Sequence, residues 1–318
     1  MNYTNMDILD QSIIYLGTEQ RNENTMHIDQ VSTEEMMRMI NNEDKKIAGC
    51  VEEAIPEISA AVEYIAARME KGGRMIYVAA GTSARVAFVD SSECPPTFHV
   101  KDGVVTCLMA GGRNCVFKAS EGVEDSEEAA VQDLMGISLN ENDTVVAAAS
   151  SGRTPYCIGG LKYAASIRAG RVSIGCNRPS LMSKYADVAI EVDTGAEAIM
   201  GSTRMKAGTA QKMIMNMLST GVMIKLGRTL DNLQISGESE NHKVSTRAPR
   251  RFAEITGNPD LAYATERITE MDGCLRCALV RELTKCDKKT AKEACAQSDG
   301  NIKAAIRIAK QKKESICE

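Results

Sequence analysis

The chain has 318 residues, 43% of them hydrophobic and 25% charged, which is typical of a folded globular protein with one or two domains. Its formal net charge is −5, and Lys and Arg are spread without a basic block, which argues against nucleic acid as a partner. The sequence has no run of about 18 apolar residues and no signal peptide at its start, so we expect a cytoplasmic protein with no membrane partner.

Two helices are predicted near the N-terminus. Ser32 lies three residues before Glu35, and this capping-box spacing predicts a helix start. A second helix is predicted to begin near Pro56, because apolar residues recur after it at helical spacing, and to end at Gly72-Gly73. Each helix has one apolar face, which predicts packing against other elements.

A repeated arrangement of strand, tight turn and helix follows. Residues 75–80 form a strand-like run that ends at Gly81-Thr82-Ser83, and residues 144–149 form another that ends at Ser150-Ser151-Gly152-Arg153. Thr154 and Pro155 then supply an N-cap and a first helical residue. Further buried strands are predicted at 172–176 and 188–192. Alternating strands and helices indicate an α/β fold with a parallel sheet.

The last third of the chain is predicted to be helical. A long apolar helix is expected over 206–226, closed by Gly227, and two short helices over 288–309 around Asp299-Gly300-Asn301. Between them lies a polar stretch at 236–245, which fits either a linker or an active-site loop.

The two hydroxyl-rich loops are candidate anion sites. In a parallel sheet both loops lie at the carboxyl edge, where ligands bind. A phosphate beside Ser83, Ser151 and Thr154 would receive hydrogen bonds from hydroxyls and from a helix N-terminus. The alternative is that each loop only caps its helix. Two such loops at equivalent positions favour the phosphate interpretation.

Two acidic segments stand out, each with an ordinary explanation beside the functional one. Glu93 precedes Pro95-Pro96, which fix the backbone and are not expected to continue a helix, so Glu93 is either rigidly presented or simply a solvated surface residue. Glu124 and Asp125 fit the first turn of a helix that continues to residue 128.

The cysteines do not indicate a metal site. Eleven Cys at irregular spacings suit a reduced intracellular chain better than a disulfide framework. Cys274-x-x-Cys277 is the one suggestive pair, but Cys286 and Cys295 are too distant in sequence to complete a zinc knuckle, and the three His are scattered. We therefore expect no bound metal.

Several segments together resemble the N-acetylmuramic acid 6-phosphate etherase family, in the sugar isomerase (SIS) superfamily that includes the glucokinase regulatory protein. The resemblance covers nearly the whole chain. Its most specific segments are Ser92-Glu93-Cys94-Pro95-Pro96-Thr97-Phe98 and Gly201-Ser202-Thr203-Arg204-Met205-Lys206, together with Ile28-Asp29, Val31-Ser32-Thr33, Ile40-Asn41-Asn42-Glu43-Asp44, Glu121-Gly122-Val123-Glu124-Asp125, Ser151-Gly152-Arg153-Thr154-Pro155-Tyr156 and Gly208-Thr209-Ala210-Gln211-Lys212.

The resemblance implies a SIS-type parallel sheet flanked by helices, and cleavage of the D-lactyl ether at C3 of N-acetylmuramic acid 6-phosphate in cell-wall sugar recycling. It implies that the protein forms a homodimer. It implies no metal or organic cofactor. Glu93 matches the glutamate that protonates the departing lactate, and Glu124 matches the second catalytic glutamate, the base for the C2 proton. Two carboxyl groups suit such an elimination, since one must be neutral and the other ionised.

The resemblance also implies a substrate pocket. Glu197 there has an alternative role as a structural partner of Lys206, and the sequence leaves both open. The implied phosphate and sugar contacts are Thr82, Ser83, Ser151, Gly152, Thr154, Glu197, Ser202 and Lys206.

Three domains are expected: an N-terminal helical segment over 1–55, a SIS domain over 56–228 and a C-terminal helical domain over 229–318. The usual family loop reads Gly-Ala-Gly-Thr-Ser-Gly-Arg, whereas this chain has Ala79-Ala80-Gly81-Thr82-Ser83-Ala84-Arg85, so two glycines are missing; the chain departs again at 234–240. A positive φ at Ala84 would weaken phosphate binding. The rival functions are a sugar-phosphate isomerase and a non-catalytic sugar-phosphate sensor.

Overall fold

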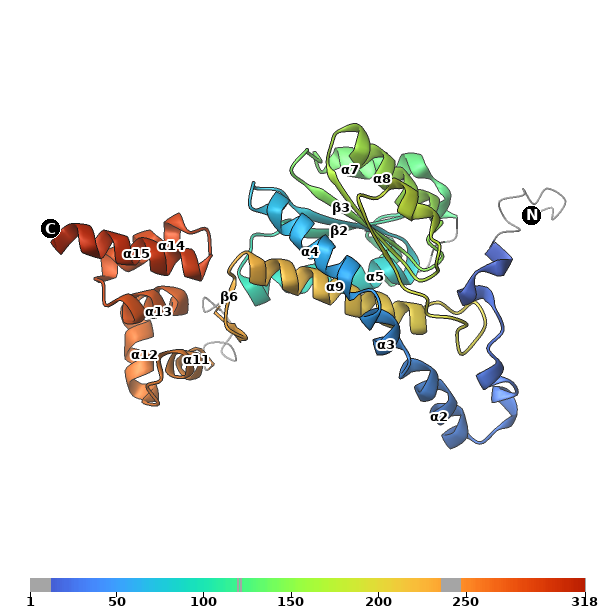
Figure 1. The fold of residues 1–318 in the computed structure, drawn as a ribbon, viewed down its shortest axis with the longest axis horizontal. Coiled ribbons are helices and arrows are strands. Elements are labelled where there is room, and N and C mark those ends of the chain that lie inside the picture. Colours follow the sequence, from blue (N-terminus) through green and yellow to red (C-terminus); the bar gives the residue numbers. More distant parts are fainter. Residues whose placement is uncertain (1–12, 119, 121, 236–246, 318) are drawn as a thin grey trace. The chain divides into compact units, whose positions relative to one another are not determined.

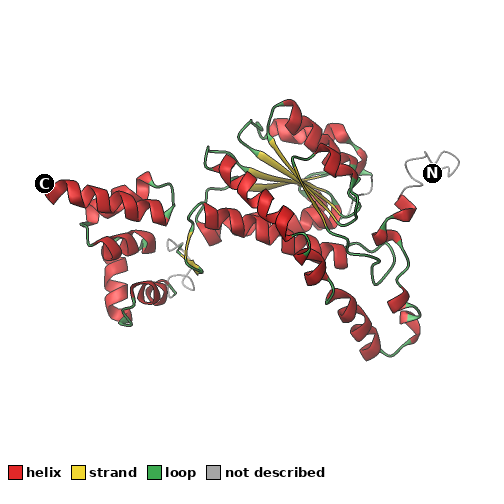
Figure 2. Ribbon diagram, in the orientation of Figure 1, coloured by secondary structure: helices red, strands yellow, loops and turns green. Residues whose placement is uncertain are grey.

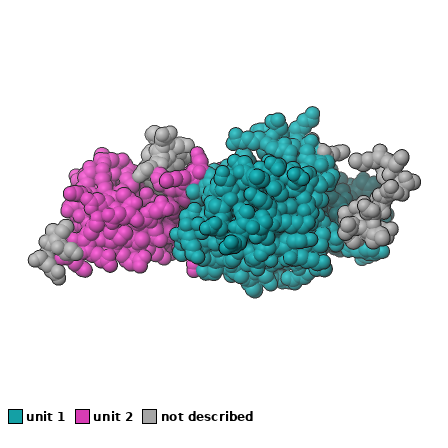
Figure 3. All heavy atoms as spheres, turned by 90° about the horizontal axis from the view of Figure 1, so that it is seen from above, with its two compact units in different colours: residues 1–92, 103–220 teal, residues 93–102, 221–318 magenta. Residues whose placement is uncertain are grey.

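The computed structural model describes residues 13–118, 120, 122–235 and 247–317. The chain divides into two compact units (Figure 3). We call residues 1–92 with 103–220 the sheet unit, and residues 93–102 with 221–318 the helical unit. The chain therefore enters the helical unit twice. The division into three domains expected from the sequence stays a prediction.

The sheet unit is built on one parallel sheet of five strands in the order β2-β1-β3-β4-β5 (Figures 1 and 2). This confirms the predicted α/β fold class. Every residue of β1 and β3 is buried, as expected where helices cover both faces of a parallel sheet. The strands are β1 Met75–Ala79, β2 Val105–Met109, β3 Thr144–Ala149, β4 Gly170–Gly175 and β5 Val188–Glu191.

Helices pack on the sheet through apolar side chains. On one face, α7 and α8 lie together and bury Leu134, Tyr156 and Leu161 against Val78 and Val145. Helix α4 contacts β4 and β5. The helices that lie wholly within this unit are α2 Thr33–Asp44, α3 Ile47–Glu52, α4 Ile55–Met69, α6 Asn114–Phe117, α7 Glu127–Gly136 and α8 Pro155–Ser166.

Two long helices continue from the sheet unit into the helical unit: α5, Gly81–Phe98, and α9, Lys206–Lys225. The expectation that Pro95-Pro96 would not continue a helix was wrong, because both lie inside α5. Proline φ is helical, and near a helix end only two carbonyls lose their donors. Helical bonding resumes beyond them, since His99 N donates to the Pro95 carbonyl at 2.9 Å.

The helical unit contains α11 to α15 and a short hairpin of β6 and β7. Its core joins Phe252, Ile268, Leu275 and Leu279 to alanines and cysteines from the neighbouring helices. Its elements are β6 Thr229–Leu230, β7 Leu233–Gln234, α11 Ala248–Thr256, α12 Leu261–Glu270, α13 Leu275–Thr284, α14 Lys288–Gln297 and α15 Ile302–Cys317. The predicted pair of helices around Asp299-Gly300-Asn301 is confirmed as α14 and α15.

Local sequence signals set most helix starts. The Ser32 hydroxyl accepts from Glu35 N at 3.3 Å, and Thr154 precedes Pro155 at the first position of α8, both as predicted. Cys274 caps α13, since its sulfur accepts from Cys277 N at 3.3 Å. The polar stretch at 236–245 lies outside the described residues. None of the helices in the described ranges combines the length and apolar character that a membrane crossing requires.

Candidate functional site

The start of α5 lies at the carboxyl edge of the sheet, directly after β1. Gly81 has a φ of +55°, Thr82 is half-buried and Ser83 is buried. A Cβ placed on Gly208 of α9 would lie 3.5 Å from the Thr82 methyl and 3.6 Å from the Thr203 carbonyl. The first turns of α5 and α9 therefore meet beside the predicted phosphate loop, and the segment containing Ser202 and Thr203 lies there with them.

The second hydroxyl loop is held in a conformation that requires glycine. Gly152 has a φ of +68°, and a Cβ there would come within 2.2 Å of the Ser180 hydroxyl. Ser180 Oγ and Met182 N both donate to the Gly152 carbonyl, at 3.3 and 2.9 Å. Within the loop, Ser151 Oγ accepts from Arg153 N at 3.2 Å. The loop is thus built from its own turn and from the segment after β4.

The two hydroxyl loops are connected through α9. Gln211 Nε2 donates to Ser150 Oγ at 3.4 Å, and Asn177 Nδ2 donates to the Ser150 carbonyl at 2.9 Å. The Thr154 hydroxyl makes no capping hydrogen bond although Thr154 is the N-cap of α8. The starts of α5 and α9 and the loop at 150–154 therefore form one continuous edge.

Glu124 lies in a 3₁₀ turn, η5, Val123–Asp125, and not in the first turn of a helix as predicted. Helix α7 begins only at Glu127, because Ser126 is its N-cap and accepts from Ala129 N at 3.1 Å. The turn packs against α8. The Glu124 side chain reaches solvent, yet the protein around it makes the charged form harder to hydrate and, with the charge of Asp125, raises its pKa.

Glu93 is an exposed residue of α5 in the part of that helix that belongs to the helical unit. Glu124 belongs to the sheet unit. The pairing of these two carboxyl groups around one substrate stays a prediction.

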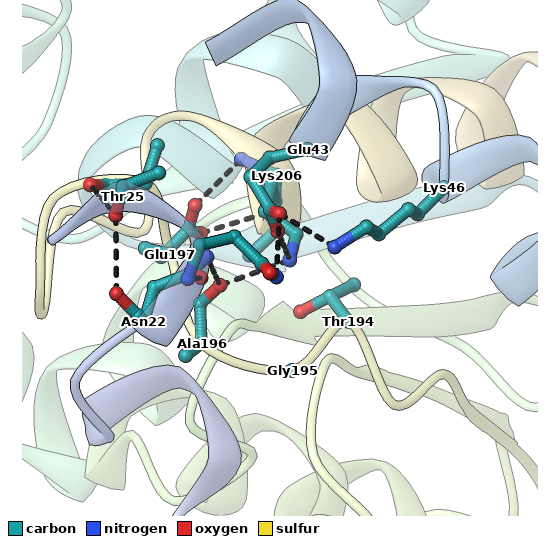
Figure 4. Close-up of polar contacts among 12 residues, drawn as sticks. Asn22, Thr25, Glu43, Lys46, Thr194, Gly195, Ala196, Glu197 and Lys206 are labelled. Carbon is teal, nitrogen blue, oxygen red and sulfur yellow. Dashed lines mark hydrogen bonds and ion pairs between the residues drawn. The ribbon is translucent and has the colours of Figure 1, made fainter. Parts of the chain in front are cut away.

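Glu197 and Lys206 are both buried, and they interact through the backbone (Figure 4). Glu197 Oε2 accepts from Lys206 N at 2.8 Å, and Oε1 accepts from Ala207 N at 3.0 Å, so this carboxyl group caps α9. Burial raises its pKa. The Lys206 ammonium instead contacts Glu43 Oε2 and the Ala196 carbonyl, each at 2.9 Å. The structural partnership has direct contacts, while a substrate role for either residue stays a prediction.

Sequence reasoning gave no role to three buried carboxylates of the sheet unit, Glu43, Asp90 and Asp143. Asp90 on α5 accepts from the Tyr77 hydroxyl at 2.8 Å, from Asn216 Nδ2 at 2.6 Å and from Ser219 Oγ at 2.9 Å. These contacts connect α5 to β1 and α9. No local pattern announces them, because the partners lie far apart in the sequence.

A family model described as the glucokinase regulatory protein N-terminal SIS domain matches residues 57–165. Proteins named N-acetylmuramic acid 6-phosphate etherase match far more of the chain. The one from Clostridium beijerinckii is 46% identical over 92% of this chain and 95% of its own length. Those from Bacillus mycoides and Exiguobacterium sp. are 45% and 44% identical, over 92% of this chain and 99% of their own length.

This chain belongs to the N-acetylmuramic acid 6-phosphate etherase family. Where other members of the etherase family usually have a glycine, this chain has Ala84, and the alanine causes no backbone strain. Ala84 lies inside α5, its φ is not positive, and its N–H donates to the Ala80 carbonyl at 3.2 Å. Alanine at this position is therefore compatible with the conformation at the start of α5.

The chain also departs from the etherase pattern at 234–240, and Gln234 in this segment makes side-chain hydrogen bonds. Gln234 Nε2 donates to the Thr97 carbonyl at 2.7 Å, and Gln234 Oε1 accepts from Arg251 at 2.8 Å. Gln234 thus connects β7 to the end of α5 inside the helical unit. Residues 236–240 lie outside the described part. Across the described ranges, no three His, Cys, Asp or Glu side chains are grouped to hold a metal ion.

Proposed function

We propose that this chain is a carbon–oxygen lyase that converts N-acetylmuramic acid 6-phosphate to N-acetylglucosamine 6-phosphate and D-lactate. The observation that carries the proposal is the 46% identity, over 92% of the chain, to a protein of that name. The continuous edge formed by the starts of α5 and α9 and the loop at 150–154 supports it, because hydroxyls and helix N-termini suit a phosphate.

The reaction we propose is an elimination followed by hydration. In the open-chain sugar the C2 proton is acidified by the aldehyde, and the Glu124 carboxylate removes it. The C2–C3 double bond forms as the C3–oxygen bond breaks, and Glu93 gives its proton to the departing lactate oxygen. Water then adds hydroxyl to C3 and a proton to C2. The raised pKa of Glu124 makes its ionised form a stronger proton acceptor.

In this proposal the phosphate anchors the sugar at Thr82, Ser83, Ser151, Gly152 and Thr154. Buried Ser83 lies in the first turn of α5, where backbone N–H groups are unpaired within the helix. An anchored phosphate would hold C2 and C3 in one place through both half-reactions.

The test separates the two glutamates by running the reaction in D₂O. We expect the unaltered protein to release lactate and to place deuterium at C2 of the product. Glu93→Gln should lower lactate release by about 100-fold or more while still exchanging the C2 proton of the substrate. Glu124→Gln should lose both. Glu128→Gln, an exposed position on α7, is the matched control and should behave as the unaltered protein does.

A sugar-phosphate sensor is a second candidate, because the SIS model that matches residues 57–165 is that of a regulatory protein. A sensor would bind the sugar phosphate and release no lactate. An isomerase would interconvert aldose and ketose phosphates without lactate. Either result in the unaltered protein would contradict the lyase proposal.

We also propose a cytoplasmic homodimer. The proposal follows from the family, and apolar side chains at the surface of α5 support it, since Val89 is 63% exposed and Phe88 37%. Light scattering should give about twice the 34.4 kDa chain mass. A monomeric mass, unchanged by Val89→Asp, would contradict the dimer.

A further inference from the structure

A buried ion pair joins the N-terminal segment to the start of α9 (Figure 4). Glu43 on α2 and Lys206 on α9 are 2% and 3% exposed, and their charged atoms lie 2.9 Å apart. The second oxygen of Glu43 pairs with Lys46, whose side chain is 49% exposed. The carboxylate of Glu43 therefore makes one buried ion pair, with Lys206, and one half-exposed ion pair, with Lys46.

The same segment is attached to the loop that precedes α9. Asn22 Nδ2 donates to the Ala196 carbonyl at 3.0 Å, and the Thr25 hydroxyl donates to the Ala198 carbonyl at 2.8 Å. Lys206 donates to the same Ala196 carbonyl. The path of the loop at 196–198 is therefore set by residues from the beginning of the chain.

That loop leads directly into the candidate site. Glu197 caps α9, and the Thr203 carbonyl accepts from Gly208 N at 3.0 Å beside Thr82. A shift of the loop at 196–198 would move Ser202, Thr203 and the first turn of α9 relative to the phosphate loop. Rigid support of this kind is what holds a binding site in a productive geometry.

We propose that Glu43 is a positioning residue, which acts through Lys206 to hold the segment at 196–208 in place for binding of the phosphosugar. The inference rests on the proposed function for the identity of the sugar, and it assigns Lys206 to this support and not to direct contact with substrate. Nearly all of the Lys206 side chain is shielded from solvent, and its ammonium already has a carboxylate and a carbonyl as partners. A buried ammonium needs such partners to remain charged.

The alternative is that the Glu43–Lys206 pair stabilises the fold and has no effect on substrate binding. A hollow of about 420 Å³ borders the pair and is lined by Glu43, Lys46 and Lys206 among others. Of the two lysine side chains, Lys46 is 49% exposed and Lys206 is 4% exposed, so water reaches mainly the contact with Lys46. Loss of the half-exposed Lys46 contact should have little effect on binding of the phosphosugar, because the hydrogen bonds that hold the loop at 196–198 come from Lys206, Asn22 and Thr25. The effect of removing the buried contact with Lys206 can thus be compared with the effect of removing the exposed contact with Lys46.

The experiment compares Glu43→Gln with Lys46→Met in the full chain. The first keeps the shape of the side chain and removes the charge facing Lys206, while the second removes only the ion pair between Lys46 and Glu43. We measure kcat and KM for lactate release, the Kd for N-acetylglucosamine 6-phosphate by calorimetry, and the melting temperature. Glu43→Gln should raise KM and Kd about tenfold with kcat within about twofold, and Lys46→Met should leave kcat, KM and Kd near the unaltered values.

A lower melting temperature with unchanged KM and Kd would overturn the inference, because a brace for stability alone predicts that result. If Glu43→Gln does not fold, Thr25→Val removes one hydrogen bond to the same loop and should raise Kd about threefold. An unchanged Kd in that variant would overturn the inference as well. Absence of lactate release from the unaltered protein would contradict the proposed function alone, since the Kd comparison still tests Glu43.

Discussion

The two compact units differ in what they bury. Among the described residues, all but two of the buried polar or charged side chains belong to the sheet unit, and the two exceptions are Thr284 and Thr290. The helical unit has a core of apolar side chains, alanines and cysteines, and many of its ion pairs lie at the surface. The sheet unit instead buries the charged groups of Glu43, Asp90, Asp143, Glu197 and Lys206.

The difference in buried side chains indicates that the interiors of the two units meet different requirements. Apolar burial alone stabilises a helical bundle, whereas each buried charge costs free energy unless it is well paired. The sheet unit carries several such groups beside the loops that we propose bind substrate. We infer that its polar interior serves to fix loop geometry. The helical unit contributes Glu93 from the surface of α5 and has no comparable set of buried charges to hold among its described residues.

Removal of Asp90 should give the largest loss of stability. Asp90→Ala takes away the acceptor shared by Tyr77, Asn216 and Ser219 in the interior. We expect the free energy of unfolding to fall by about 4 kcal/mol, measured by urea denaturation. Thr290→Ala, at a buried polar position of the helical unit, should cost less than about 1.5 kcal/mol. Equal losses would contradict the contrast between the units.

Acid should weaken the sheet unit through Glu43. Burial alone would raise the pKa of Glu43, but hydrogen bonds from Lys46, Lys206 and Asn22 and the charge of Lys206 outweigh it and lower the pKa from 4.5 to about 2. Because the folded pKa lies below the unfolded one, this stabilisation is complete above pH 4.5 and is lost as the pH falls towards 2. It amounts to about 3 kcal/mol. Urea unfolding of the unaltered protein and of Glu43→Gln between pH 6 and 2 should therefore converge at low pH, and parallel curves would contradict the assignment.

Loss of the α9 cap should have a smaller effect. Glu197→Ala leaves the buried N–H groups of Lys206 and Ala207 without their acceptor, so we expect a loss of about 2 kcal/mol. Calorimetric titration with N-acetylglucosamine 6-phosphate distinguishes this role from a sugar contact. A strong loss of binding with unchanged stability would show that Glu197 contacts the ligand.

The smallest effect is expected on the surface of the helical unit. Asp272 pairs with Lys288 and Lys292, but its side chain is 60% exposed. Solvent and salt screen such pairs. Asp272→Ala should leave the melting temperature unchanged within error, and a clear decrease would show that exposed ion pairs do stabilise this unit.

Local patterns were sufficient for most of the fold. The caps at Ser32 and Thr154, the apolar runs of β1 and β3 and the periodicity of α9 each predicted an element that the structure contains. Strand β2 was not predicted, and as an edge strand it is only partly buried and mixes Thr and Cys with apolar residues. The course of α5 through its prolines was predicted wrongly, because a rule for helix interiors was applied close to a helix end.

The candidate site was less accessible to sequence reasoning, because its supports are long-range. Glu43 and Lys206 are 163 residues apart, and Asp90 and Asn216 are 126 apart. No local spacing encodes such pairs. Residue types at loops and helix starts could still predict the hydroxyl loops, since those signals lie within a few consecutive residues.

The double entry of the chain into the helical unit has a consequence for biosynthesis. Residues 93–102, which include Glu93, leave the ribosome long before residues 221–318, the rest of the unit to which they belong. Cys94, Phe98 and Val100 are buried in the finished protein, and the stretch that contains them groups with residues 221–318, which are made later. A nascent chain stalled before residue 221 should therefore expose this short apolar stretch and be a ready client for a chaperone.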